Sequence, residues 1–122
     1  MTIATLDREY FQQNDVLTRL NHLAAHLLQI QLLATNATDK DEIASLIRGS
    51  RYYIEWTVPQ LVEIDVDSAA LLVDLGRILT RWLFNWEIIW TDTTNRGEIA
   101  QIASQALEGV QEIAKLTIVS HF

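Results

Sequence analysis

Cysteine is absent from this chain, which excludes disulfides, iron–sulfur clusters, thiolate zinc sites and cysteine nucleophiles. Only one proline and four glycines occur in 122 residues. That is too few for the many tight turns of an all-β protein. Basic residues are also scarce, with nine Lys and Arg against sixteen Asp and Glu and a net charge of −7. Because an acidic protein repels phosphate backbones, we expect no nucleic-acid partner.

Long uncharged hydrophobic runs are missing as well. The most apolar segment, residues 69–90, is interrupted by four charged residues, namely Asp74, Arg77, Arg81 and Glu87. A membrane span needs about 20 predominantly apolar residues, so we expect no membrane partner. The first nine residues lack the basic and apolar regions of a signal peptide. We therefore expect a cytoplasmic protein.

What the sequence does contain is enough apolar material for a core. Hydrophobic residues make up 49% of the chain and charged residues 20%, a balance that is too apolar for a disordered protein. A chain of this length is typical of one domain, so we expect a single domain over residues 1–122.

Apolar residues recur at spacings of three and four almost everywhere, which is the period of an α-helix. The pattern predicts an all-α fold with four helices, at about residues 6–34, 39–64, 67–90 and 95–120. Pro59 lies inside the second pattern, where it lacks an amide hydrogen and clashes with the preceding turn. We therefore expect a kink or a break near residues 56–58.

The links between these segments are only a few residues long, so sequential helices must be antiparallel neighbours. This predicts an up-down-up-down four-helix bundle. The alternative is a three-helix core with a helical hairpin that swaps or docks onto a partner. Small residues of the fourth segment, from Ala100 to Ala114 with Gly109 among them, are expected to pack against the tryptophans of the third.

Three tryptophans, Trp82, Trp86 and Trp90, recur one turn apart on the third predicted helix. An aromatic stripe at helical spacing is usually core, and this is the interpretation that we favour. The same stripe would also suit a pocket for a planar cofactor. The sequence itself implies no particular cofactor.

His22 and His26 are one turn apart on the first predicted helix. Such a pair places two imidazoles on one side of a helix, but a protein metal site needs at least a third ligand. The sequence shows no metalloprotease motif and no di-iron motif. An ordinary solvated helix surface is therefore the favoured interpretation, with metal binding as the weaker one.

Catalytic signatures are lacking. No serine lies in a nucleophile-elbow motif, and no glycine-rich phosphate loop is present. We therefore expect no enzymatic activity.

Four large side chains are expected to face away from the core. On the third predicted helix Phe84 and Ile88 fall opposite the apolar stripe, and Tyr52 and Trp56 do so on the second. Contiguous exposed apolar surface usually marks an interface. Arginines surround these positions (Arg48, Arg51, Arg77 and Arg81), and arginine is enriched with aromatics at interface centres.

Two functional hypotheses follow. The first is a non-catalytic interaction or structural module that forms a homodimer through the outer faces of helices two and three, with Tyr52 and Trp56 of one copy on Phe84 and Ile88 of the other. A different protein partner at the same surface is a variant of this hypothesis. The second is a ligand- or metal-binding bundle that uses the tryptophan stripe or the histidine pair.

Overall fold

The computed structural model describes the backbone of residues 2–119 and the side chains of residues 16–118. Within this part every element is a helix: α1 (Thr2–Thr35), α2 (Lys40–Ile64), α3 (Val66–Phe84), α4 (Trp86–Thr91) and α5 (Thr93–Val119). The prediction of an all-α protein is confirmed. The predicted last residue of the fourth helix, Ser120, lies outside the described residues.

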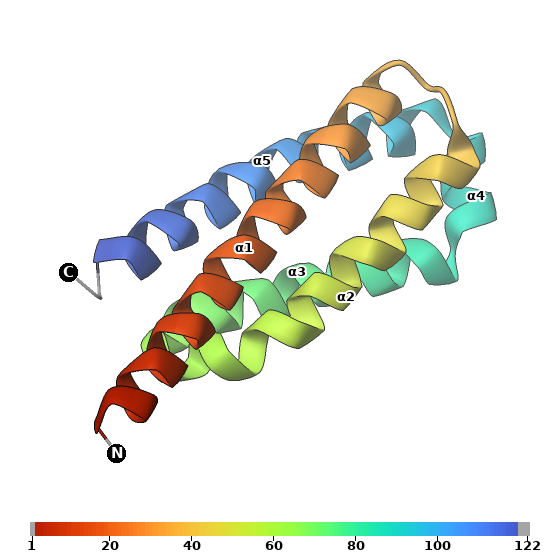
Figure 1. Cartoon of the computed structure of the whole chain (residues 1–122). Helices are drawn as coiled ribbons and strands as arrows, with labels where there is room; N and C mark the ends of the chain where they lie inside the picture. The colour runs from red at the N-terminus through yellow and green to blue at the C-terminus, as the bar shows by residue number, and fades with distance from the viewer. Residues whose placement is uncertain (1, 120–122) are drawn as a thin grey trace.

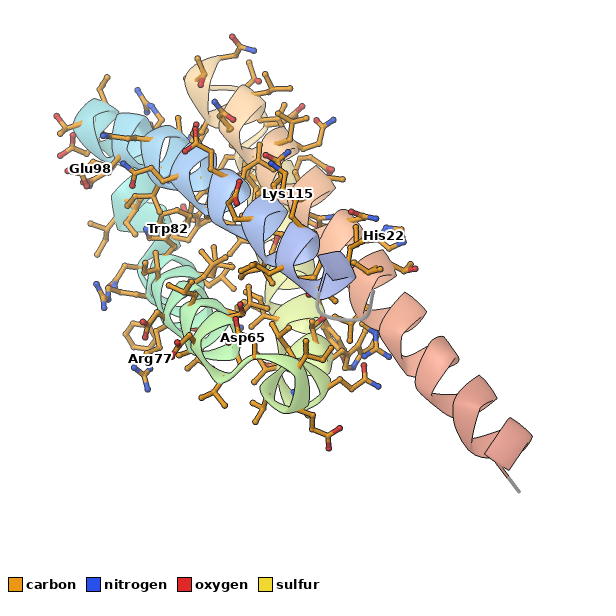
Figure 2. All side chains as sticks on the ribbon, turned by 90° about the vertical axis from the view of Figure 1, so that its left-hand side faces the viewer. His22, Asp65, Arg77, Trp82, Glu98 and Lys115 are labelled. Atoms are coloured by element: carbon orange, nitrogen blue, oxygen red, sulfur yellow. The ribbon has the colours of Figure 1, made fainter. Side chains whose placement is uncertain are left out.

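The long helices lie side by side and run back and forth along one direction (Figure 1). The most extensive contacts are those of α1 with α5, of α1 with α2, and of α2 with α3. In contrast, α3 and α5 approach each other closely at few positions. Trp82 of α3 is buried in the core (Figure 2).

One apolar stripe of each long helix forms a common core. Its fully buried members include Leu20, Leu27 and Ile30 of α1, Ile43, Ile47 and Leu61 of α2, Leu72 and Leu79 of α3, and Ile99 and Val110 of α5. The spacings of three, four and seven that predicted the helices therefore also identify the inward-facing side of each.

The helix α2 is continuous through Pro59 from Lys40 to Ile64, so the break that the sequence predicted does not occur. Packing of the apolar side of α2 on its neighbours outweighs the one backbone hydrogen bond that Pro59 cannot make. A change of direction of the helix axis at this point stays a prediction.

The third predicted helix is interrupted instead, at Asn85, which separates α3 from α4. Asn85 has φ −111° and ψ 21°, and its side-chain amide donates to the carbonyl of Arg81 at 3.3 Å. Asparagine competes with helical hydrogen bonding in this way, which explains why the helix ends here. The prediction of one helix over residues 67–90 was wrong on this point.

The expected packing of the tryptophans on small residues does not extend to Gly109. Ala103 of α5 is buried, but a Cβ built on Gly109 would meet nothing within 4 Å. Gly109 is therefore not required for a close approach of two helices.

No helix in the described part of the chain is both long and apolar enough to cross a membrane.

Candidate functional site

The most exposed large apolar side chains of the described region gather on α2, α3 and α4. The six most exposed are Phe84 (88%), Ile88 (72%), Val66 (65%), Leu71 (59%), Tyr52 (57%) and Trp56 (53%). Phe84, Ile88, Tyr52 and Trp56 are the four residues that the sequence placed opposite the core stripe. The surface of α2, α3 and α4 that carries these four residues is the candidate site, and we call it the outer face.

The interruption at Asn85 is part of this surface. Phe84 is the last residue of α3 and Ile88 lies in the first turn of α4. Between them Trp86 turns inward and is buried. The two most exposed apolar side chains thus flank the one position where the chain leaves helical geometry.

Arg19 of α1 contacts both the ring and the backbone of Trp56. The Arg19 guanidinium lies 6.0 Å from the Trp56 ring centroid, and its Nη1 donates to the Trp56 carbonyl at 2.8 Å. The same nitrogen also donates to Oε1 of Gln60 at 2.9 Å. Tyr52 meets the Trp56 ring edge to face at 4.9 Å between centroids. Sequence reasoning missed Arg19, because its partners lie 37 and 41 positions away along the chain.

An apolar groove runs between α2 and α3. Its volume is about 470 Å³, and its walls include Arg51, Val58 and Pro59 of α2 and Val73, Gly76 and Arg77 of α3. A Cβ built on Gly76 would lie 3.5 Å from Cγ2 of Ile54, so these two residues are at the same level of the antiparallel pair. The groove is open to solvent along the outer face.

Four arginines lie at one level of the outer face, although the chain as a whole is acidic. Because α2 and α3 are antiparallel and Ile54 is level with Gly76, residues 48 and 51 of α2 fall level with positions 82 and 79 of α3, close to Arg77 and Arg81. We call this set the arginine band; its members are Arg48, Arg51, Arg77 and Arg81. It holds four of the nine basic residues of the chain.

Two acidic residues partly neutralise the positive charge of the arginine band. Arg51 approaches Glu55 at 3.9 Å, and Arg77 approaches Asp74 at 3.4 Å. Such exposed pairs contribute little to stability. Arg48 and Arg81 are exposed, so the band keeps a net positive charge.

The two histidines pack on one tyrosine. The His22 ring stacks on Tyr53 at 5.4 Å, and the His26 ring meets it edge to face at 5.3 Å. His26 Nδ1 donates to the carbonyl of His22 at 2.9 Å. Among the side chains that the structure describes, no three histidine, aspartate or glutamate residues lie close enough to hold one metal ion. The pair therefore lacks a third ligand there and acts as an aromatic contact between α1 and α2.

The tryptophan stripe divides into a buried and a partly exposed part. Trp82 and Trp86 are buried, and Trp90 lies 5.6 Å from the Trp86 ring. The Arg96 guanidinium lies 5.5 Å from the Trp90 ring, and its Nη1 donates to the Trp90 carbonyl at 2.7 Å. The Trp86 Nε1 is a buried donor with no hydrogen-bond partner in the described region.

Comparisons with protein families, with curated proteins and with solved structures find no match to this chain.

Proposed function

We propose that the chain is a non-catalytic interaction or structural module, an up-down-up-down four-helix bundle that acts as a homodimer through the outer face of α2, α3 and α4. The observation that carries the proposal is the exposure of Tyr52, Trp56, Phe84 and Ile88 on neighbouring elements. Leaving these side chains in water is unfavourable, because burial of a fully exposed large apolar side chain contributes about 1.5–3 kcal/mol before the cost of association.

The composition of the outer face also supports this function. Aromatic residues and arginine are the types enriched at interface centres, whereas lysine is depleted. The outer face carries four arginines in the arginine band, and neither of the two lysines of the chain lies among them. In a two-fold dimer both copies bury the same surface, so a single exposed face on each chain is enough to form the interface.

The test replaces two side chains that contribute nothing to the core. Phe84→Ser with Ile88→Ser should give a folded monomer, whereas the wild type should be a dimer in size-exclusion chromatography with light scattering. The matched control is Leu28→Ser with Leu32→Ser, which removes two exposed apolar side chains one turn apart on α1. The control should stay dimeric. A double serine variant that stays dimeric would sink the proposed interface.

A ligand- or metal-binding bundle is the second candidate, and one observation favours it. The buried Trp86 Nε1 has no acceptor in the described region, and a buried donor without a partner is costly. A bound molecule that supplies an acceptor would remove this cost. Metal analysis and an absorption spectrum of the purified protein separate the two candidates, because only the second requires a stoichiometric metal or chromophore.

A further inference from the structure

We propose that the second copy lies antiparallel on the outer face, about a two-fold axis at the level of Asp74 and Leu75, so that Arg81 meets Asp67 of the second copy and Arg48 meets its Glu63. This inference rests on the proposed homodimer and specifies its register. It replaces an arrangement in which the aromatics of one copy cover those of the other.

Positive charge accumulates at one level of the outer face. The arginine band occupies one level of both α2 and α3, near Thr80. A two-fold axis parallel to the helices keeps every residue at its own level, so it brings the two bands together. A perpendicular axis near Thr80 does the same. Like charges placed opposite each other at an interface are strongly unfavourable, so the charges exclude both arrangements.

A perpendicular axis nearer the α2–α3 turn removes this conflict. Such an axis reverses the helix direction and places each helix opposite its own copy, with the same side of the helix at the contact. On α3, Arg81 lies seven residues after Asp74, and Asp67 lies seven residues before it. Seven residues are close to two turns, so all three lie along one side of α3. An axis at Asp74 therefore pairs Arg81 with Asp67 of the second copy, twice per dimer.

The same axis pairs opposite charges on α2. Because Ile54 is level with Gly76, the level of Asp74 and Leu75 corresponds to Glu55 and Trp56 on α2. Arg48 lies seven residues before Glu55, and Glu63 lies seven residues after Trp56. With the axis at the level that the charge pair on α3 requires, Arg48 therefore meets Glu63 of the second copy. Two helices give the same register independently.

The acids nearest the axis do not oppose this register, because each already has a basic partner. Asp74 lies 3.4 Å from Arg77 of its own chain, and Glu55 lies 3.9 Å from Arg51. Near the axis each copy therefore presents pairs of opposite charge, and not isolated carboxylates.

Two exposed apolar residues of α3 also meet across the dimer in this register. Phe84 lies nine residues after Leu75, and Val66, which is also exposed, lies nine residues before it. These two residues are eighteen apart, or five full helical turns, so they share one side of α3. The register places Phe84 on Val66 of the second copy and buries both. Val73 lies between Val66 and Phe84 along α3, lines the open groove and is close to the axis.

Two cysteine variants of this cysteine-free chain distinguish the registers. Val73→Cys lies close to the axis, so its two copies are within about 6 Å along the helix direction. Thr80→Cys is seven residues further along the same side of α3, and its two copies are about 16 Å apart. Both substitutions are uncharged and both positions are exposed. A short bismaleimide should crosslink Val73→Cys into a dimer and leave Thr80→Cys uncrosslinked.

Charge reversal supplies the second measurement. Arg81→Asp alone and Asp67→Arg alone should each raise the dissociation constant of the dimer at least tenfold in sedimentation equilibrium. The two changes combined in one chain should restore it to within about threefold of the wild type, because the swapped charges meet again. Added salt should weaken the wild-type dimer, since it screens the pairs of opposite charge.

The outcomes separate the register from the dimer itself. If the wild type is monomeric, both proposals fail. If the protein is a dimer in which Thr80→Cys is the variant that crosslinks, or in which the double charge reversal does not restore association, the register is wrong and the proposed homodimer stands.

Discussion

The His26 imidazole lies directly against Gly49: a Cβ at position 49 would be 3.0 Å from its Nε2 and 3.1 Å from its Cδ2. The ring has little room to move away, since Tyr53 contacts it on α2 and its Nδ1 is bonded to the His22 carbonyl. The glycine is thus what allows the histidine to fill this part of the α1–α2 contact.

This relationship predicts opposite effects of the same substitution at two helical glycines. Gly109→Ala should raise the free energy of unfolding by about 0.5–1 kcal/mol, because alanine favours the helix and a Cβ at position 109 meets nothing. Gly49→Ala should give no gain or a loss, because the new methyl group displaces His26. Urea denaturation measures both.

The control is Gly49→Ala in a His26→Ala background. In this background Gly49→Ala should stabilise the protein as much as Gly109→Ala does in the wild type, because the imidazole ring no longer occupies the space that the new methyl group needs. A Gly49→Ala variant as stable as Gly109→Ala, with His26 intact, would show that the contact does not constrain the helices.

Trp86 should be one of the most important residues of the core. Trp86→Ala should lower the free energy of unfolding by about 3–5 kcal/mol, because it removes a large buried side chain. Trp56→Ala should cost less than half as much, since about half of that side chain is already in water. Equal losses in the two variants, measured by chemical denaturation, would contradict the assignment of Trp86 to the core.

The histidine pair should not bind zinc tightly. Equimolar Zn²⁺ should leave the thermal unfolding midpoint of the wild type unchanged, and the variant His22→Ala with His26→Ala should respond in the same way. The reason is the lack of a third ligand in the described region. Stabilisation by zinc that is lost in the variant would establish a metal site.

The helices themselves were predictable because they depend on local periodicity. The spacing of Leu20, Leu23 and Leu27, all fully buried, is the same information that places them on one side of α1. The exposure of Phe84 and Tyr52 follows from the same reasoning, since a residue opposite the apolar stripe faces away from the core.

The interruptions and long-range contacts were not predictable in this way. Asn85 ends α3 whereas Pro59 does not end α2, although proline is intrinsically the stronger helix breaker. At Asn85 the side chain competes for a helical carbonyl, whereas at Pro59 tertiary packing keeps the helix continuous, and the apolar periodicity does not distinguish the two cases. Similarly, Asp39 stands before α2 with φ 55° and makes no side-chain capping bond, although aspartate is one of the preferred N-cap residues.

The contact of Arg19 with Trp56 has the same origin. It joins residues 37 positions apart, and it depends on how α1 rotates against α2. The sequence grouped the four arginines of the arginine band, but their common level rests on the contact of Gly76 with Ile54 across α2 and α3.

The mass of the wild-type protein in solution tests the central claim most directly. Sedimentation velocity at tens of micromolar in low salt should give a single species with twice the chain mass of 13.9 kDa. Dilution should convert it into a species of the chain mass. A protein that sediments as a 13.9 kDa monomer throughout this range would contradict the account, and its exposed aromatics would then have to serve a different partner.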